Sequence, residues 1–337
     1  MNIENNFILS DENPLVSIVI PMLDESHHIL RCLESIKNQD YPADKIEVCI
    51  VDGLSTDGSR EIVDKYSKDH ANILLLDNPG RRTAISLNIG AKAAKGEVII
   101  ILGAHSYIET NFISKNIQLM KEKNVPCVGG TQLNRGATYI QQGIGNAMAS
   151  PFGILSAPYR FKKKSGYVDT VVYAAYHRTI FQEVGYFDER AIIAEDAEFN
   201  WRIRQAGYEI FFSPDIISYY IPRSNLMRLA KQFFRYGILR INVVKKHLDA
   251  LKLLHVVPAT FVFLLCIAGI ASFFNGYFAS LFIILWIVYG AYLLTATIST
   301  AVQSGLRYWP VLPLAFAAMQ LCFGAGFLVG LFKSQHS

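Results

Sequence analysis

The sequence predicts an α/β protein in which a mostly parallel sheet with flanking helices is followed by a basic interfacial helix and about three transmembrane helices. The prediction rests on alternating strand and helix patterns near the N-terminus, a basic segment after residue 222, and a long uncharged tail. Hydrophobic residues make up 51% of the 337 residues and charged residues 18%, whereas a typical soluble domain carries about 25% charged residues. This composition excludes a disordered chain and favours association with a membrane.

Four short apolar runs in the first hundred residues have the length and the β-branched composition of strands. They are Leu15–Pro21, Ile46–Val51, Asn72–Leu76 and Glu97–Leu102. The segments between them have helical spacing of apolar residues and are Glu25–Gln39, Gly58–Lys68 and Arg81–Ala94. Near-continuous apolar strands alternating with helices indicate a parallel sheet covered on both faces, an architecture typical of nucleotide-binding proteins. Ligands of such sheets bind beyond the carboxyl ends of the strands.

The charges divide the chain into three regions. Residues 1–222, the expected α/β domain, hold 22 Lys and Arg against 27 Asp and Glu. Residues 223–252 hold eight basic residues and one acid, and residues 253–337 are almost uncharged. A mildly acidic body with a basic segment and an apolar tail indicates a membrane-associated protein and excludes a nucleic-acid binder.

The tail contains three apolar stretches, near residues 256–273, 277–298 and 310–332, which we predict to be transmembrane helices because a bilayer core needs about 20 apolar residues per helix. Lysines just before the first stretch place that side, and with it the N-terminal domain, in the cytoplasm. The protein is thus expected to be a multi-pass protein of the inner or plasma membrane. Its first residues have no signal-peptide pattern, and its five scattered cysteines suit a reducing compartment.

The loops that follow the predicted strands contain acidic and small residues. The segment PMLDE at 21–25 follows the first strand, DGLSTDG at 52–58 the second, and GAHS at 103–106 the fourth. Neither a G-x-G-x-x-G nor a P-loop motif is present, which disfavours dinucleotide-binding and P-loop proteins. Carboxylates at these positions can accept hydrogen bonds from a nucleotide base or from ribose hydroxyls.

In combination these motifs resemble family two glycosyltransferases with a GT-A fold. The resemblance includes LNIGAKAAKGE at 87–97 and GYFDE at 185–189, followed by AEDAEFNWRIRQAGY at 194–208, and it covers about residues 14–250. The subgroup that the chain most resembles is the membrane-associated succinoglycan-biosynthesis type.

The resemblance implies a donor site for a nucleotide sugar. Pro21 and Glu25 would border the base, and Asp52 would accept a hydrogen bond from it. Arg82 would either meet the diphosphate or be solvated. Asp57 is expected to cap the helix that follows it.

The segment after the fourth strand departs from the family pattern. The family places D-x-D or D-x-H there and binds a divalent metal through the diphosphate, but this chain has Gly103 and then His105. His105 remains a candidate metal ligand. Mg²⁺ prefers oxygen ligands, whereas Mn²⁺ tolerates nitrogen better. The alternatives are that basic residues replace the metal or that His105 is an ordinary loop histidine.

The resemblance also implies a catalytic base, because an inverting transfer needs a group that removes the proton of the acceptor hydroxyl. Asp196 matches this position, and Glu195 would orient or support it. The same two carboxylates suit the N-terminus of a helix over 197–205, which is the alternative explanation.

The basic segment contains QFFRY at 232–236, which is similar to the Q-x-x-R-W motif of membrane-linked members. Gln232, Arg235 and Tyr236 would therefore contact the acceptor. The surrounding helical spacing also predicts a helix that lies on an anionic membrane surface, and the two roles are compatible.

The leading interpretation is a membrane-anchored inverting glycosyltransferase that transfers a sugar from a nucleotide diphosphate donor, by default a UDP-sugar, to a lipid-linked glycan. The product would be a unit of exopolysaccharide or another surface polysaccharide. One alternative is a polyprenyl-phosphate glycosyltransferase, in which the lipid phosphate attacks. A processive synthase is disfavoured by the small number of spans. A third alternative, from another class, is a non-catalytic membrane partner with a degenerate site, which the glycine at 103 would favour.

Overall fold

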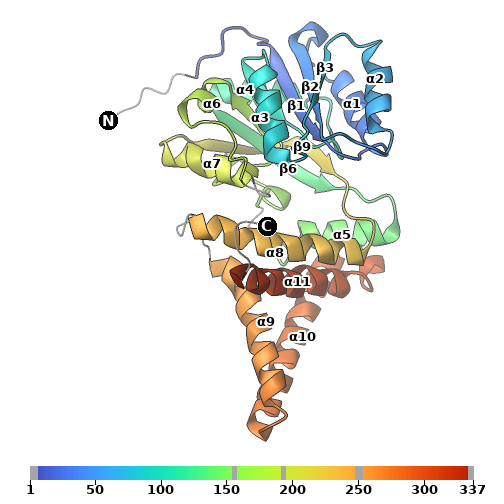
Figure 1. Cartoon of the computed structure of the whole chain (residues 1–337), viewed down its shortest axis with the longest axis vertical. Helices are drawn as coiled ribbons and strands as arrows, with labels where there is room; N and C mark the ends of the chain where they lie inside the picture. The colour runs from blue at the N-terminus through green and yellow to red at the C-terminus, as the bar shows by residue number, and fades with distance from the viewer. Residues whose placement is uncertain (1–6, 154–157, 191–194, 247–252, 333–337) are drawn as a thin grey trace. The chain divides into compact units, whose positions relative to one another are not determined.

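The computed structural model describes residues 7–153, 158–190, 195–246 and 253–332 (Figure 1). The chain forms two compact units, which comprise Met1–Leu133 with Ala157–Tyr220, and Asn134–Ser156 with Ile221–Ser337. The three-part division predicted from the sequence, at residues 222 and 252, remains a prediction.

The first unit is built on a nine-stranded sheet with the order β3-β2-β1-β4-β8-β6-β9-β5, and β7 pairs with β9. The pairs β1–β2, β2–β3 and β1–β4 are parallel, and each of these strands ends within one residue of its predicted limits. The β-branched runs form these strands because such side chains pack well on a pleated, buried surface. The four strands are β1 (Val16–Met22), β2 (Ile46–Asp52), β3 (Ile73–Asp77) and β4 (Val98–Ile101).

Helices cover both faces of this parallel half. Successive side chains of a strand point to opposite faces, so Ile18 packs in one apolar cluster with Ile29 of α1, whereas Val19 packs in another with Leu87 of α3. At Gly90 of α3 an added Cβ would collide with Val19, so the helix approaches β1 closely. The helices are α1 (Ile29–Lys37), α2 (Ser59–Ser67) and α3 (Thr83–Ala93).

The sheet as a whole is mixed, which corrects the prediction of a mostly parallel sheet. The pairs β4–β8, β6–β8, β5–β9 and β7–β9 are antiparallel. The sequence pattern missed them because β8 has only three residues and the β9 segment is interrupted by Ser213, Pro214 and Asp215. The later strands are β5 (Ser106–Ile108), β6 (Cys127–Asn134), β7 (Gly166–Tyr167), β8 (Ala175–His177) and β9 (Ile210–Tyr220).

The helix α7 is fixed to the segment before β8 by a buried amide. Asn200 is fully buried; its Nδ2 donates to Thr170 Oγ1 at 2.9 Å and to the Val171 carbonyl oxygen at 3.0 Å, and its Oδ1 accepts from the Tyr176 hydroxyl at 3.0 Å. The helix that carries the proposed base is therefore anchored in the core. The other short elements of this unit are η1 (Ala43–Lys45), α4 (Phe112–Lys123), η2 (Pro158–Arg160), α6 (Thr179–Glu183) and α7 (Glu195–Gln205).

The second unit is helical and contains two helices that are long and apolar enough to cross a membrane, α10 and α11. The prediction of three spans is corrected: the third apolar segment among the described residues, Val256–Ala271 of α9, is shorter than these two helices, and it ends two residues before the predicted limit, where the turn Ser272–Phe274 follows. The helices are α5 (Tyr139–Ala149), α8 (Leu226–Lys246), α9 (Leu253–Ala271), α10 (Gly276–Ser304), η4 (Leu306–Tyr308) and α11 (Leu312–Phe332).

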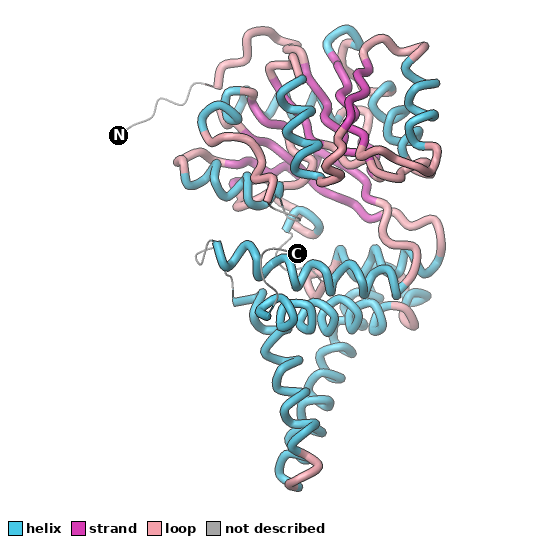
Figure 2. Tube along the Cα trace, in the orientation of Figure 1, coloured by secondary structure: helices cyan, strands magenta, loops and turns pink. Residues whose placement is uncertain are grey.

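Within this unit α8 and α11 run side by side in the same direction, and α9 and α10 project away from them as a hairpin (Figures 1 and 2). Glycines allow the close approach of the pair. A Cβ at Gly326 would collide with the backbone of Phe234, and one at Gly330 would come within 2.9 Å of the Ile238 carbonyl oxygen. The most apolar part of the chain thus divides into a projecting hairpin and a helix packed along basic α8.

Candidate functional site

The parallel register brings the carboxyl ends of the first strands together. Met22 pairs with Asp52, and Asp52 pairs with Asp77. The loops that leave β1, β2 and β4 carry most of the residues that the sequence predicted for the donor site. Pro21, the sixth residue of β1, is half-buried at this edge.

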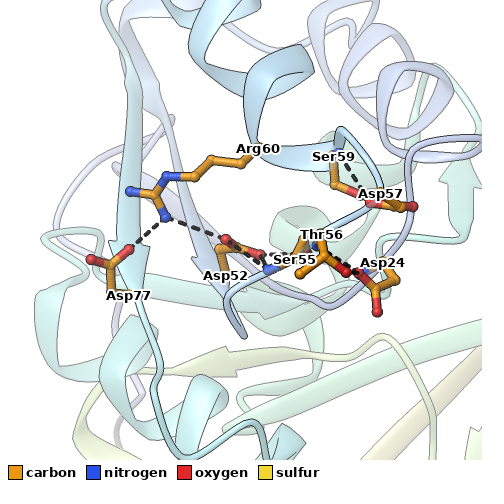
Figure 3. Close-up of polar contacts among 8 residues, drawn as sticks. All are labelled: Asp24, Asp52, Ser55, Thr56, Asp57, Ser59, Arg60 and Asp77. Atoms are coloured by element: carbon orange, nitrogen blue, oxygen red, sulfur yellow. Dashed lines mark hydrogen bonds and ion pairs between the residues drawn. The ribbon is translucent and has the colours of Figure 1, made fainter.

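Asp52 is a fully buried carboxylate with partners for both oxygens (Figure 3). Its Oδ1 accepts from the Ser55 hydroxyl at 2.6 Å and from the Ser55 backbone N–H at 3.1 Å, and Arg60 Nη1 lies 3.3 Å from Oδ2. The same Arg60 nitrogen lies 2.6 Å from Asp77 Oδ1. A buried polar group without such partners is strongly destabilising, so this network holds the carboxylate in a fixed orientation.

The loops after β1 and β2 are also held together by reciprocal hydrogen bonds. The Thr56 N–H donates to Asp24 Oδ1 at 2.8 Å, and the Ser26 N–H donates to Asp57 Oδ2 at 2.9 Å. Asp57 precedes the N-cap residue of α2, Gly58, and its Oδ1 accepts from the Ser59 N–H at 3.1 Å, so it meets the first N–H of the helix without being the N-cap itself. Although burial opposes the shift, hydrogen bonds from Ser59 and Ser26 hold the pKa of Asp57 well below its usual value.

Glu25 and His105 form a hydrogen-bonded pair across the loops after β1 and β4. Glu25 Oε1 lies 2.9 Å from His105 Nδ1, and both side chains are partly exposed, at 19% and 30%. A carboxylate on one ring nitrogen orients the imidazole and leaves Nε2 free to face a ligand. The ring edge of His105 also packs against Tyr220 at the end of β9.

Gly103 has a steric reason to lack a side chain. A Cβ at this position would lie 3.0 Å from the Tyr173 hydroxyl and 3.3 Å from Ser106 Oγ, and these two hydroxyls are hydrogen bonded to each other. The space that an aspartate would need at the first motif position is therefore taken by a Tyr–Ser pair.

The described residues hold no group of three His, Cys, Asp or Glu side chains placed to bind a metal ion. The fit to a divalent metal is therefore partial: His105 offers Nε2 and is oriented by Glu25 in the way that metal-binding histidines are. Such an ion would need oxygen ligands from substrate phosphates and water to complete its shell.

Arg82 is exposed and immediately precedes α3, after the loop that leaves β3. Its backbone carbonyl oxygen accepts from Asn78 Nδ2 at 3.0 Å, which fixes the start of the helix without engaging the guanidinium. The structure thus places Arg82 after the strand next to β2 with its charged group facing solvent.

Glu195 and Asp196 form the first turn of α7, together with Glu198. Asp196 Oδ1 accepts from the Ala197 N–H at 2.8 Å, so the predicted helix-terminus geometry is present. Burial of its carboxyl group, and then the neighbouring Asp196 carboxylate, raise the pKa of Glu195 to about 7.

Gln232, Arg235 and Tyr236 lie on α8, in the other unit. Gln232 is buried; its Nε2 donates to the Tyr236 hydroxyl at 2.7 Å, and its Oε1 accepts from Arg223 Nε at 3.2 Å. Arg235 is exposed. Gln232 and Tyr236 therefore share one face of the helix, and Arg235 faces another direction.

Sequence reasoning missed several residues at the first site. Arg60 and Asp77 could have been found, because Asp77 directly follows a predicted strand and Arg60 lies in the first turn of the helix predicted after Asp52. Tyr173 and Tyr220 gave no signal, since they come from the antiparallel strands and loops that the pattern did not reveal.

The fold is shared with known glycosyltransferases. The mannosyltransferase PcManGT from Pyrobaculum calidifontis, solved in complex with GDP-Man and Mn²⁺, superposes with a TM-score of 0.60 at 19% identity, over 93% of this chain and 88% of that chain. This likeness establishes a GT-A-type α/β fold.

Residues 17–185, half of the chain, match the model of glycosyl transferase family 2, and the protein belongs to this family. It is a glycosyltransferase. A dolichyl N-acetyl-α-D-glucosaminyl phosphate 3-β-D-2,3-diacetamido-2,3-dideoxy-β-D-glucuronosyltransferase from Methanococcus voltae is 29% identical over 94% of this chain and 97% of its own length. The succinoglycan biosynthesis protein ExoA from Rhizobium meliloti is 28% identical over 92% and 93%. The resemblance noted in the sequence is confirmed.

Proposed function

We propose that the protein transfers a sugar from a nucleotide diphosphate donor to a lipid-linked glycan at a membrane surface, with inversion at the anomeric carbon. The observation that carries the proposal is the placement of buried Asp52 and the Glu25–His105 pair at the carboxyl ends of parallel strands. This is where open α/β sheets bind their ligands.

The donor's base and ribose are assigned to the loops after β1 and β2. Asp52, held by Ser55 and Arg60, accepts a hydrogen bond from a ring N–H of the base, and Pro21 and Glu25 border it. A uridine nucleotide is our choice of donor because of the family resemblance. Exposed Arg82 is available to the diphosphate.

The chemical step is a displacement at the anomeric carbon. The acceptor hydroxyl oxygen forms the new bond to this carbon as the bond to the diphosphate oxygen breaks. Asp196 takes the hydroxyl proton, and the nucleoside diphosphate leaves as an anion. His105, which Glu25 orients, is assigned to stabilise the charge that develops on the leaving group. A divalent cation bound to His105 and the phosphate oxygens would neutralise that charge.

Two relatives that align over almost their whole length support a lipid-linked glycan as acceptor. The Methanococcus voltae relative is named for a sugar attached to dolichyl phosphate, and the Rhizobium relative for a polysaccharide. The first of these names favours a hydroxyl of a lipid-linked sugar over the lipid phosphate of the polyprenyl-phosphate alternative. Gln232, Arg235 and Tyr236 are proposed to contact this acceptor.

We also propose that α8 lies on the cytoplasmic membrane surface and that the α9–α10 hairpin enters the bilayer. Basic α8 suits an anionic surface. Although α11 is long enough to cross a membrane, its close packing along α8 supports a position beside it at the interface.

The test is donor turnover by the full-length protein in detergent, with a panel of nucleotide sugars, a lipid-linked sugar acceptor and either Mn²⁺ or Mg²⁺. We expect one or more donors to be converted, and Asp196→Asn to lower kcat by about 10²–10⁴-fold, the range attributed to general base catalysis. Asp215→Asn, at an exposed position on β9, is the matched control and should retain activity.

Donor binding without turnover in the wild type, unchanged by Asp196→Asn in the presence of acceptor, would sink the catalytic proposal. It would support the non-catalytic partner instead.

A further inference from the structure

Arg160 is a cation near the donor site that the proposed reaction has not yet used. It ends the short helix η2, and its Nε and Nη1 atoms are buried without a hydrogen-bond partner among the described residues. Buried N–H groups of a guanidinium that have no acceptor cost free energy. Such a group is retained either for stacking or for an anion that binds during function.

The surroundings of Arg160 connect it to the Glu25–His105 pair. Its guanidinium carbon lies 5.6 Å from the centre of the Tyr220 ring, and Tyr220 packs against His105 at 5.3 Å between ring centres. Tyr220 also pairs with Ser106 across β5 and β9. Arg160 and His105 thus flank one buried aromatic ring.

Arg160 is also electrostatically close to the pair of hydroxyls that fills the space beside Gly103. Burial raises the pKa of Tyr173, and the positive charge of Arg160 opposes this shift. The region where the family motif would carry a carboxylate therefore has a tyrosine, a serine and a cation in its place. The cation thus stands where the family has a negative carboxylate, and its charge attracts anions to this region.

We propose that Arg160 binds an oxyanion of the substrates, a phosphate oxygen, next to His105. The guanidinium is suited to this because its fixed, always charged donors match phosphate geometry. The inference rests on the proposed function, and the phosphate has two sources. It is the diphosphate of the donor, which we favour because Arg160 and His105 flank the same ring, or the phosphate of the lipid-linked acceptor.

The experiment uses the full-length protein in detergent. Calorimetry measures the affinities for UDP and UMP, and a transfer assay measures the KM for a lipid-linked sugar acceptor. The variants are Arg160→Gln, Arg160→Lys and Lys162→Gln. Lys162 is a matched control because its ammonium lies over Phe212, also at 5.6 Å, and donates to the Tyr167 carbonyl oxygen at 3.5 Å.

For a diphosphate role, Arg160→Gln should weaken UDP binding by about 10–100-fold, the worth of a hydrogen bond to a charged group. It should change UMP binding less, and Arg160→Lys should lose less than Arg160→Gln. Lys162→Gln should stay within about twofold of the wild type. Unchanged UDP affinity with a tenfold higher acceptor KM would assign the phosphate to the acceptor.

Unchanged UDP affinity together with an unchanged acceptor KM overturns the inference and leaves Arg160 a stacking residue. If Arg160→Gln does not fold, as judged by its melting curve, Arg160→Lys decides between the same outcomes. A wild type that binds neither UDP nor GDP would contradict the proposed function itself, so the two failures are distinguishable.

Discussion

Glu25 Oε1 lies 2.9 Å from His105 Nδ1 and joins the loop after β1 to the loop after β4. In the tautomer with the proton on Nδ1, the carboxylate accepts a hydrogen bond from Nδ1–H, and Nε2 is left with a lone pair. One glutamate therefore orients the imidazole that we propose to face the leaving diphosphate.

Glu25→Gln should lower kcat/KM by about 10–100-fold, the usual effect of removing the partner of a functional histidine. The loss should be larger at low Mn²⁺ than at saturating Mn²⁺ if His105 is a ligand, because the reoriented ring binds the ion less tightly. The measurement is kcat/KM as a function of Mn²⁺ concentration. Glu61→Gln, exposed on α2, is the control. Wild-type activity of Glu25→Gln at every Mn²⁺ concentration would show that the pair only supports the loops.

The parallel half of the sheet could be predicted from the sequence because its strands are continuous apolar runs. Each run ends at a loop with acidic or small residues, so the strand ends pointed to the loops that carry Glu25, Asp52 and His105, and the family resemblance supplied their expected roles. Their partners were only partly predictable. Arg60 and Asp77 are local to these strands, whereas Tyr173 reaches the site from a segment far away in sequence.

The antiparallel half and the packing of the tail could not be predicted for a physical reason. Strands such as β8 and β9 are short or polar-interrupted and are specified by their neighbours in the sheet, not by a local period. The apolar residues of the tail follow neither a helical nor a strand period. Hydropathy does not distinguish a helix that crosses the bilayer from one that packs along α8. The assignment of α11 depends on glycines whose contacts appear only in the fold.

Gly103→Ala should destabilise the protein by about 1–2 kcal/mol, because its Cβ would stand 3.0 Å from the Tyr173 hydroxyl and would force the tyrosine to move. Tyr173→Phe removes that hydroxyl and should relieve part of the cost. The double variant is therefore expected to be more stable than the sum of the two single changes predicts. Melting temperatures of the four proteins of this cycle measure the coupling. Strict additivity would mean that Tyr173 does not fill the space beside Gly103.

Glu195→Gln should make the protein more stable at neutral and alkaline pH. A carboxyl pKa raised from 4.5 to about 7 means that the folded state binds the proton more tightly than the unfolded state. The free energy of unfolding therefore falls as the pH rises from 4.5 to 7 and is constant above that. The glutamine variant lacks this loss and should be more stable than the wild type at pH 8, by on the order of 3 kcal/mol.

The check is the difference in melting temperature between Glu195→Gln and the wild type across pH 5 to 8. We expect a difference that grows through this range and levels off above pH 7. Glu209→Gln, an exposed glutamate before β9, should show no such trend. A constant difference across the range would mean that Glu195 does not titrate there.

The position of α11 predicts on which side of the membrane the chain ends. If α11 lies beside α8, the end of α10 and the end of α11 face the same side, whereas a third span would place them on opposite sides.

The test uses single cysteines at Leu306 and Phe332, both exposed, in a background with Cys266 and Cys322 replaced by Ser, since the other three cysteines are buried. An impermeant maleimide should label both positions in inside-out vesicles and neither in vesicles of the opposite orientation. Phe274→Cys, at the turn between α9 and α10, marks the far end of the hairpin and should not be labelled from the same side as the other two positions. Labelling of Leu306→Cys and Phe332→Cys from opposite sides would show that α11 crosses the bilayer and that its contacts with α8 do not form in the membrane.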